Sequence, residues 1–581
     1  MDHARAGHDE VRSALRGIPI FSELTEDLRE EIIAESSLLR LPAGEWLFRQ
    51  DDAGDALYVV CSGRIEVVRE RPAPTSVLRV LGRGAAVGEL ALLTDSPRSA
   101  SARGIRDSDI LRVGREQVMG LLHESPAFAI ALTRVLGRLL QASGGAPEAR
   151  RPRVAVIAVV PAHRGVEVGA FAGELRRAMA HSGSVALLGH DAIEGAEEDS
   201  GAFAEHGRLL DLHERDHDHV LLVGAEDGDP RWNAFCRRQA DRVVAVAVPG
   251  ASSTSAEPRT PGEAADLVIW GPSDMGVRHV HALLERVRPA RHHFVAGEAG
   301  VARLARRLLG RSVGVVLSGG GAGGLAHVGV LEVLVSSGVA IDRVGGCSFG
   351  SFVGGLLAMG KSPAEIIEVC REHLVRQNAF NDYVVPRHSL IRGRKGRAML
   401  HRALGEVAIE QLPLDFYCVS SDLLSAEVIV HRRGSLAEAV RASASIPGLG
   451  PPVRRDGRLL VDGGVLNNFP VDIMLRTGEG PVVGVDVMGR RMHRPAATAW
   501  GDPTGAEVYR APRPNIYEVL SRATALGSWQ AAERLRTRAD VVIAPDLTGT
   551  GMLDFKRMDA IMEAGREAAR AALEEAPHLV A

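Results

Sequence analysis

A serine in a glycine-flanked turn is the residue of this sequence best suited to nucleophilic chemistry. Residues 344–351 read Val-Gly-Gly-Cys-Ser-Phe-Gly-Ser, a short strand that ends in Gly-x-Ser-x-Gly. This pattern is typical of the sharp turn that presents a serine hydroxyl for attack. Gly346 and Gly350 flank Ser348, and side chains at those two positions would meet the neighbouring strand and helix.

A glycine loop upstream of this serine offers backbone donors. The apolar run 313–317 predicts a buried parallel strand, residues 318–324 read Ser-Gly-Gly-Gly-Ala-Gly-Gly, and residues 327–334 have a helical pattern. A glycine loop before a helix exposes N–H groups at the positive end of the helix dipole. We expect this loop to stabilise a phosphate or an oxyanion.

Asp462 is the candidate base. It follows the apolar residues 459–461 and precedes Gly463 and Gly464, so its carboxylate can approach a serine closely. A serine hydroxyl needs a base that takes its proton as the new bond forms. An aspartate with an ordinary pKa of about 4 is a weak base in water, and partial burial would raise that pKa.

These segments together resemble the patatin-like phospholipases, over roughly the last half of the chain. The resemblance includes residues 441–447, which read Arg-Ala-Ser-Ala-Ser-Ile-Pro. It implies a Ser–Asp dyad with Ser348 as nucleophile and Asp462 as base, and no metal. The oxyanion loop it implies comprises Gly319, Gly320 and Gly321. The family usually has arginine where this chain has Gly323, which places the rigidity of the loop in question.

Three alternatives remain open at this point. Gly319, Gly321 and Gly324 also fit the dinucleotide fingerprint, with Asp342 as its acidic companion. His327 could complete a Ser-His-Asp triad, although its place early in a helix favours a packing role. A patatin fold that is catalytically silent, and acts as a ligand-sensing scaffold, is the third hypothesis.

The N-terminal part has a different pattern. Short alternating runs at 56–60 and 64–68 are separated by glycines, as in an antiparallel β-barrel. Residues 88–100 resemble the phosphate-binding cassette of cyclic nucleotide-binding domains. The resemblance implies that Arg98 binds the cyclic phosphate and that Glu89 accepts from the ribose hydroxyl. Ser99 leaves cGMP possible, and we expect cAMP. The expected ligand-binding residues are Gly88, Glu89, Leu90, Arg98 and Ser99.

The middle of the chain predicts a Rossmann-like α/β layer, because apolar strands alternate with helical segments. The loop 161–169 lacks the Gly-Lys-Ser/Thr of a P-loop, which argues against nucleotide hydrolysis. A histidine and aspartate cluster at 213–219 could bind a metal, and a solvated turn is the alternative. The predicted strands are 154–160, 185–188, 219–223, 243–248 and 267–270, and the predicted helix is 170–179.

We therefore expect a multidomain protein with three domains: a cyclic nucleotide-binding β-barrel at 12–142, the α/β middle domain at 152–298 and an α/β patatin-like hydrolase domain at 311–580. This combination resembles the neuropathy target esterase group. It implies a serine esterase of (lyso)phospholipids, a lysophospholipase or carboxylesterase, regulated by a cyclic nucleotide and requiring no other cofactor.

Composition narrows the remaining possibilities. The 581 residues carry a net charge of −4, which gives no support for nucleic-acid binding. Lys361, Lys395 and Lys556 are the only lysines beside abundant arginine, a bias typical of GC-rich bacteria. Five scattered cysteines, no signal peptide and no apolar run of membrane-spanning length predict a cytoplasmic protein, with peripheral contact at the inner membrane face. Such contact could involve the basic residues Arg387, Arg392, Arg394, Lys395, Arg397 and Arg402.

Overall fold

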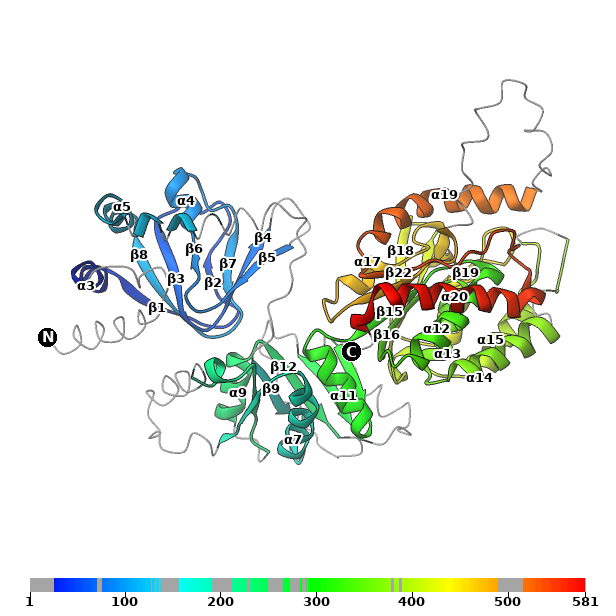
Figure 1. Cartoon of the computed structure of the whole chain (residues 1–581), viewed down its shortest axis with the longest axis horizontal. Coiled ribbons are helices and arrows are strands. Elements are labelled where there is room, and N and C mark those ends of the chain that lie inside the picture. The colour runs from blue at the N-terminus through cyan, green and yellow to red at the C-terminus, as the bar shows by residue number, and fades with distance from the viewer. Residues whose placement is uncertain are drawn as a thin grey trace, which may run out of the picture. The chain divides into compact units, whose positions relative to one another are not determined.

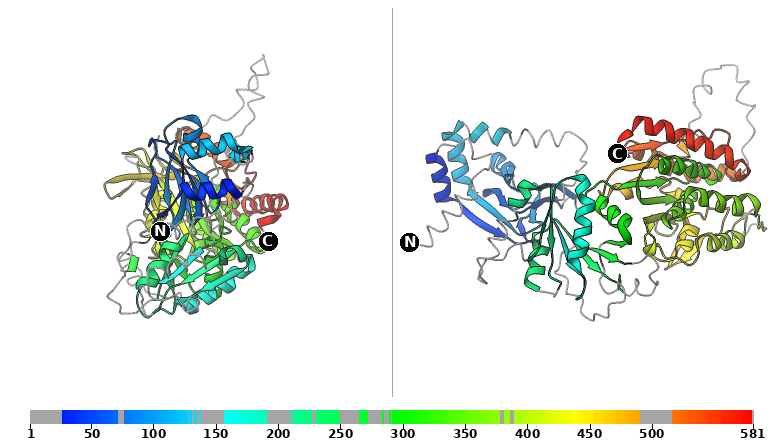
Figure 2. Two further views of the ribbon diagram at one scale, coloured as in Figure 1. Left: turned by 90° about the vertical axis from the view of Figure 1, so that its left-hand side faces the viewer. Right: turned by 60° about the horizontal axis from the view of Figure 1, so that its bottom comes forward.

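The chain forms two compact units (Figures 1 and 2), Met1–Trp270 with Leu284–His292 and Gly271–Leu283 with His293–Ala581. The computed structural model describes residues 26–70, 76–126, 128–130, 132–134, 137, 156–190, 210, 212–226, 230–248, 265–271, 283–284, 289, 291–377, 381–385, 389–489 and 516–579.

The first unit begins with the predicted β-barrel, which is drawn in blue in Figure 1. Its two four-stranded sheets have the strand orders β1-β8-β3-β6 and β2-β7-β4-β5, and their pairs are antiparallel. The first six residues of β3 are all buried, because this strand contacts helices on one face and the barrel interior on the other. The elements are α3 Glu26–Glu35, β1 Ser37–Leu41, β2 Trp46–Phe48, β3 Ala56–Ser62, β4 Ile65–Arg69, β5 Ser76–Leu81, β6 Ala86–Val87, α4 Glu89–Thr94, β7 Ser101–Gly104, β8 Ser108–Gly114 and α5 Arg115–Glu124.

A parallel sheet follows, with the order β10-β11-β9-β12-β13-β14. The registers of β9 to β13 are parallel, which confirms the predicted α/β layer. Strands β9 and β11 are buried along their whole length, as expected for continuous apolar runs in a parallel sheet. The elements are β9 Val156–Pro161, α7 Val168–Met179, β10 Val185–Leu188, β11 His219–Val223, α9 Pro230–Gln239, β12 Arg242–Ala247, β13 Asp266–Trp270 and β14 Arg291–Val295.

Ion pairs join the barrel and the parallel sheet within this first unit. Arg106, which is 3% exposed, donates through Nη2 to both carboxylate oxygens of Glu214 at 2.9 Å. Arg64 donates to Asp241 at 2.7 Å. The barrel and this sheet fall in one compact unit. The predicted domain boundaries 12–142, 152–298 and 311–580 therefore stay predictions.

The second unit is built on a mixed sheet with the order β19-β20-β17-β16-β15-β21-β22, and β18 pairs with β17. Its centre is parallel, while β18, β19 and β20 form an antiparallel extension. The strands are β15 Val313–Leu317, β16 Ile341–Cys347, β17 Asp415–Asp422, β18 Glu427–His431, β19 Val453–Arg455, β20 Arg458–Asp462, β21 Val482–Val485 and β22 Val541–Ile543. The helices are α11 Gly297–Leu308, α12 Ala326–Ser336, α13 Phe349–Ala358, α14 Pro363–Cys370, α15 Arg394–Leu404, α16 Leu436–Ser443, α17 Val471–Leu475, α19 Ile516–Arg536 and α20 Met558–Glu575.

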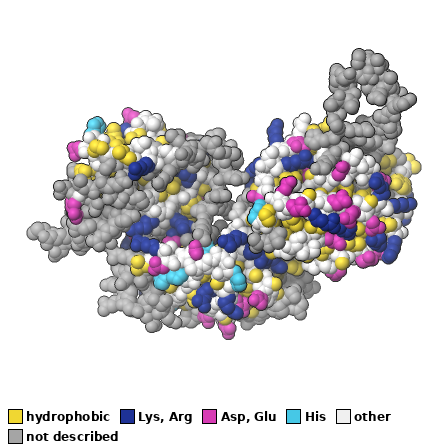
Figure 3. Space-filling model, viewed as in Figure 1, with side chains coloured by type: hydrophobic (Ala, Val, Ile, Leu, Met, Phe, Trp, Pro, Cys, Tyr) yellow, Lys and Arg dark blue, Asp and Glu magenta, His cyan; other side chains and the backbone are white. Residues whose placement is uncertain are grey.

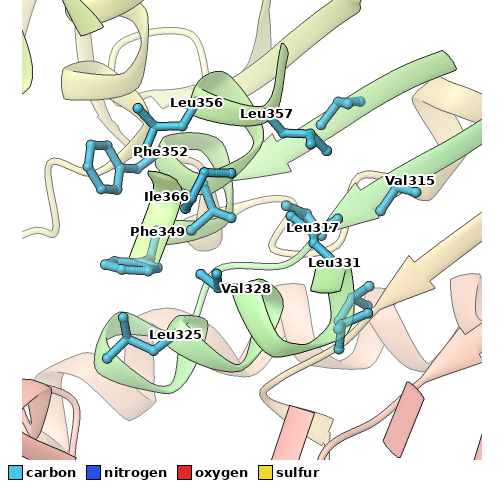
Figure 4. Packing of buried hydrophobic residues seen from close by; sticks show 14 of the residues in the cluster. Val315, Leu317, Leu325, Val328, Leu331, Phe349, Phe352, Leu356, Leu357 and Ile366 are labelled. Atoms are coloured by element: carbon cyan, nitrogen blue, oxygen red, sulfur yellow. The ribbon is translucent and has the colours of Figure 1, made fainter. Parts of the chain in front are cut away.

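The core of this unit lies between β15 and the helices α12 and α13 (Figure 4). Leu317, Leu331 and Phe352 are among its buried side chains. Helix α20 packs tightly on α12, because a Cβ at Gly565 would lie 2.1 Å from the carbonyl oxygen of Ala326. Among the described residues, no helix is long and apolar enough to cross a membrane.

We predict that Gly350→Ala destabilises the second unit by about 3 kcal/mol, as is typical of overpacking. A Cβ at residue 350 would lie 2.3 Å from the carbonyl oxygen of Leu317 and 2.5 Å from that of Ser318. Gly527→Ala is the matched control, because a Cβ at residue 527, in α19, would have no atom within 4 Å. Urea unfolding of the full chain measures both variants, and equal midpoints would contradict the crowding argument.

Candidate active site

Ser348 occupies the turn between β16 and α13. Its backbone has φ 50° and ψ −123°, a conformation that L-residues rarely adopt. A Cβ at Gly346 would lie 2.7 Å from the carbonyl oxygen of Gly350. The predicted sharp turn is therefore confirmed, and its flanking glycines are sterically required.

The structure brings Ser348 and Asp462 together from separate strands. The serine Oγ donates to Oδ2 of Asp462 at 2.6 Å, and both side chains are buried. The other carboxylate oxygen accepts the N–H of Gly464 at 2.7 Å. Asp462 ends β20, where it pairs with Ser420 of β17. Both carboxylate oxygens are thus held by donors, which fixes the orientation of the group.

Burial raises the pKa of the Asp462 carboxyl to about 6, although hydrogen bonds from Ser348 and Gly464 oppose this change. Desolvation disfavours the charged form, so the carboxylate holds a proton more tightly than it does in water. This is the direction expected from the sequence. A carboxylate with this pKa is a stronger base that is still ionised near neutral pH.

The predicted glycine loop lies beside Ser348. The N–H of Gly319 donates to the Asn468 carbonyl at 3.2 Å, and the Asn468 side-chain amide donates back to the Gly319 carbonyl at 3.1 Å. A Cβ at Gly319 would lie 3.0 Å from the Cβ of Ser348. Gly321 begins the short 3₁₀ turn Gly321–Leu325, so its N–H has no acceptor within that turn.

Gly323, in place of the usual arginine, is buried in this turn, and other contacts hold the loop. The N–H of Ala322 donates to the Met552 carbonyl at 2.8 Å. His327 is fully buried, and its Nε2 lies 2.8 Å from the carbonyl oxygen of Ser318, to which it donates. Burial lowers the pKa of His327 to about 4, so the imidazole is neutral. Its hydrogen bond to Ser318 positions the loop, as the packing interpretation predicted.

Two residues at the site were not predicted. The N–H of Ser348 donates to Oγ of Ser443 at 2.9 Å, and Asn468 bonds to the glycine loop as described above. The segment 441–447 is part of the family resemblance, but the sequence indicates no role for Ser443. Asn468 follows Asp462 by six residues, and no pattern in the sequence indicates that its side chain returns to Gly319.

Asp342 does not fit a dinucleotide site. It lies near the start of β16, whereas the glycine loop follows the end of the neighbouring parallel strand β15. Its carboxylate is buried and accepts from Nε and Nη2 of Arg306 at 2.8 and 2.6 Å. The acid that the fingerprint requires is therefore at the opposite end of the strands.

Arg98 of the cassette is held by acceptors from several parts of the barrel. Its guanidinium, 2% exposed, donates to the carbonyl oxygens of Gly88 at 3.0 Å and Ala56 at 2.9 Å, and to Asp55 at 3.1 Å. It also lies 4.4 Å from the ring centroid of Phe48. Gly88 has φ 92°, a left-handed conformation that starts α4.

Two buried polar atoms near this helix have no hydrogen-bond partner: Oε2 of Glu89 and Nε of Arg98. Burial raises the pKa of Glu89, which is 2% exposed. A ribose hydroxyl and a phosphate are groups that would satisfy these atoms. Leu90 and Ser99 are exposed, so they are available to a ligand or to another element.

The predicted metal cluster and the predicted basic stretch are the remaining candidate sites. In the part of the chain that the structure describes, no group of three or more His, Cys, Asp or Glu side chains is arranged to hold a metal ion, the 213–219 cluster included. Of the basic stretch, Arg387 lies outside the described residues. Arg394, Lys395, Arg397 and Arg402 lie on α15, and Arg392 precedes it.

Comparisons with known proteins agree with this arrangement. A family model described as patatin-like phospholipase matches residues 315–475, and one described as cyclic nucleotide-binding domain matches residues 38–125. An uncharacterized NTE family protein of Mycobacterium tuberculosis is 34% identical, over 99% of this chain and 98% of its own length.

Two longer relatives match part of their length. Human patatin-like phospholipase domain-containing protein 6 is 28% identical over 87% of this chain and 40% of its own length. Lysophospholipase NTE1 of Coccidioides immitis is 27% identical over 91% of this chain and 40% of its own length.

We predict that a fluorophosphonate probe modifies Ser348 faster as the pH rises through about 6. Asp462 accepts the serine proton only when it is ionised, and its pKa in the folded chain is about 6. Below that pH the rate should fall about tenfold per pH unit. Mass spectrometry of the labelled peptide measures the rate, with Asp462→Asn as the control without this titration. A rate independent of pH between about 5 and 7 would contradict the role of Asp462.

Proposed function

The chain belongs to the NTE family, and from that premise we propose that it is a lysophospholipase that works through Ser348 and Asp462. It is an enzyme of the patatin-like phospholipase class and carries a cyclic nucleotide-binding domain. The 2.6 Å hydrogen bond between the serine Oγ and the buried Asp462 carboxylate is the observation that carries the proposal.

In the first half-reaction, Oγ of Ser348 attacks the ester carbonyl carbon while its proton passes to Oδ2 of Asp462. The tetrahedral intermediate then collapses, the bond to the alcohol breaks, and Asp462 returns the proton to the leaving oxygen. This leaves an acyl ester on Ser348. In the second half-reaction, water gives its proton to Asp462, attacks the acyl carbon and releases the fatty acid with Ser348 restored.

The glycine loop supplies the electrostatic part of the proposal. Gly320 and Gly321 are the proposed oxyanion donors, with Gly321 at the start of the 3₁₀ turn. The N–H of Gly319 donates to the Asn468 carbonyl, and Gly319 allows close approach to Ser348. Removing one such donor typically costs about 2.7–4 kcal/mol of barrier. The contacts of Asn468, Met552 and His327 do the positioning that arginine does elsewhere in the family.

A lysophospholipid is the proposed substrate, and α15 is the proposed contact with a bilayer surface. The helix begins Arg394-Lys395-Gly396-Arg397, and Tyr383 and Val385 nearby are 66% and 90% exposed. Cations beside exposed apolar side chains suit an anionic membrane surface. We therefore propose peripheral association at the cytoplasmic face of a membrane.

The direct test is release of fatty acid from lysophosphatidylcholine. We expect Ser348→Ala to lower kcat/KM by roughly 10⁴-fold or more, as is typical of nucleophile removal, and to abolish fluorophosphonate labelling. Ser337→Ala, a change at the end of α12 away from the site, is the control. A wild-type chain that neither releases fatty acid nor accepts the probe would instead favour the silent scaffold.

The barrel is proposed to bind cAMP in preference to cGMP and to regulate the hydrolase. The unpartnered Oε2 of Glu89 and Nε of Arg98 support a ligand with both a hydroxyl and an anionic group. The left-handed Gly88 and the short helix α4 suit a phosphate as well. The preference for cAMP rests on the resemblance, and the hydroxyl of Ser99 keeps cGMP as the alternative.

We predict that Glu89→Gln weakens cAMP binding about tenfold, the loss expected for one hydrogen bond to a charged group. Arg98→Ala should abolish binding, and its thermal unfolding must be followed because Arg98 also holds Asp55 and Gly88. Calorimetric titration of the full chain with cAMP and with cGMP measures each effect. Arg40→Gln, an exposed change in the same barrel, is the control. Unchanged affinity in Glu89→Gln would refute the assignment.

A further inference from the structure

A cavity of about 330 Å³ lies on the antiparallel extension of the second unit. Its lining includes four arginines, Arg432, Arg433, Arg455 and Arg458, and one acid, Asp456. Figure 3 shows basic and acidic side chains interspersed over the visible face of this unit. The lining of this cavity, with four basic side chains and one acidic side chain, therefore differs from that surrounding mixed surface.

The β19–β20 hairpin forces two of these arginines together. Asp456 and Gly457 have φ of 50° and 75°, as in a two-residue type I′ turn. Arg455 and Arg458 are consequently direct cross-strand partners. Like charges directly opposite each other destabilise an antiparallel pair, so the hairpin retains an unfavourable interaction that an anion would relieve.

The neighbouring acids compensate this charge only in part. Arg455 lies 3.3 Å from Asp456, whose side chain is 81% exposed. Arg458 lies 3.7 Å from Asp422 and 3.6 Å from Glu427, separations longer than a hydrogen bond. Arg432 lies 5.0 Å from the ring centroid of Tyr417. Among the ion pairs of the described residues, none involves Arg433.

Apolar side chains also line the cavity, among them Leu460, which is buried, and Ile429, which is half-buried. His431 is also buried and bonds through Nε2 to Oγ of Ser420 at 2.8 Å. Apolar side chains beside guanidinium groups lower the local dielectric, which strengthens charge-assisted hydrogen bonds. Guanidinium forks match the geometry of phosphate oxygens.

We propose that this cavity binds a phosphate group, as a phosphomonoester or phosphodiester anion. The site is separate from Ser348 and does not depend on the acyl-transfer proposal. Arg458, Leu460 and Asp462 alternate along β20 and so share one face of the strand. At about 3.3 Å per residue, Arg458 lies about 13 Å along the strand from Asp462. The phosphate can belong to a lipid headgroup or to a soluble molecule.

Two binding experiments on the full chain separate these sources. Calorimetry at constant ionic strength uses inorganic phosphate and glycerol 3-phosphate. Cosedimentation compares phosphatidylcholine vesicles with and without phosphatidate. The test variant is Arg455→Gln with Arg458→Gln, and Arg454→Gln is the matched control, because residue 454 is exposed and does not line the cavity.

We expect the double variant to bind at least about tenfold more weakly, and Arg454→Gln to bind as the wild type does. Loss confined to phosphatidate vesicles identifies a lipid headgroup, and loss confined to the soluble anions identifies a free phosphate. A thermal midpoint of the double variant equal to or above that of Arg454→Gln shows that folding is intact; if the double variant unfolds early, Arg433→Gln replaces it. No binding by the wild type, or equal binding by the double variant, would overturn the proposal.

Discussion

The site depends on a steric constraint: several backbone segments meet where a side chain has no room. Gly346 and Gly350 crowd each other across the turn at Ser348, and Gly319 approaches the serine from β15. At Gly463 a Cβ would lie 2.4 Å from the carbonyl oxygen of Val419. Because these glycines allow the segments that follow β15, β16 and β20 to approach one another, two residues separated by 114 positions share a hydrogen bond. The strained φ of Ser348 is maintained by the packed helices and strands around it.

The same close packing sets the electrostatics. Asp462 is buried, so desolvation outweighs the donors that stabilise its charge, and its pKa rises. The buried His327 shows the opposite response, since desolvation of an imidazole lowers its pKa. Cys347 lies 3.9 Å from Asp462, and burial raises its thiol pKa well above the ordinary value. A carboxylate beside a neutral thiol, with the neutral imidazole of His327 bonded to the Ser318 carbonyl instead, is consistent with a dyad in which the carboxylate alone moves a proton.

Local sequence predicted the parallel strands well, because their apolar runs are short and bounded by glycine or polar residues. The predicted limits of β10, β11 and β15 agree with the structure. The antiparallel pairing of β20 with β17 was not predicted, since its register joins residues up to 42 positions apart, as with Ser420 and Asp462. Ser443 and Asn468 were missed for the same reason, because their partners are distant in the chain. The sequence left open a Ser-His-Asp triad with His327, because the direction of the His327 side chain, toward the Ser318 carbonyl, is seen only in the structure.

The folding of the barrel fixes the side chain of Arg98 before any ligand binds. Its guanidinium already contacts three acceptors and the face of Phe48 in the folded barrel. An arginine side chain carries about 2 kcal/mol of rotamer entropy, and here that freedom is lost when the chain folds. An incoming anion would therefore bind a preorganised cation. Little further conformational entropy of that side chain would be lost on binding, so the affinity would be higher. The barrel stability and the ligand affinity are in this way coupled through one residue.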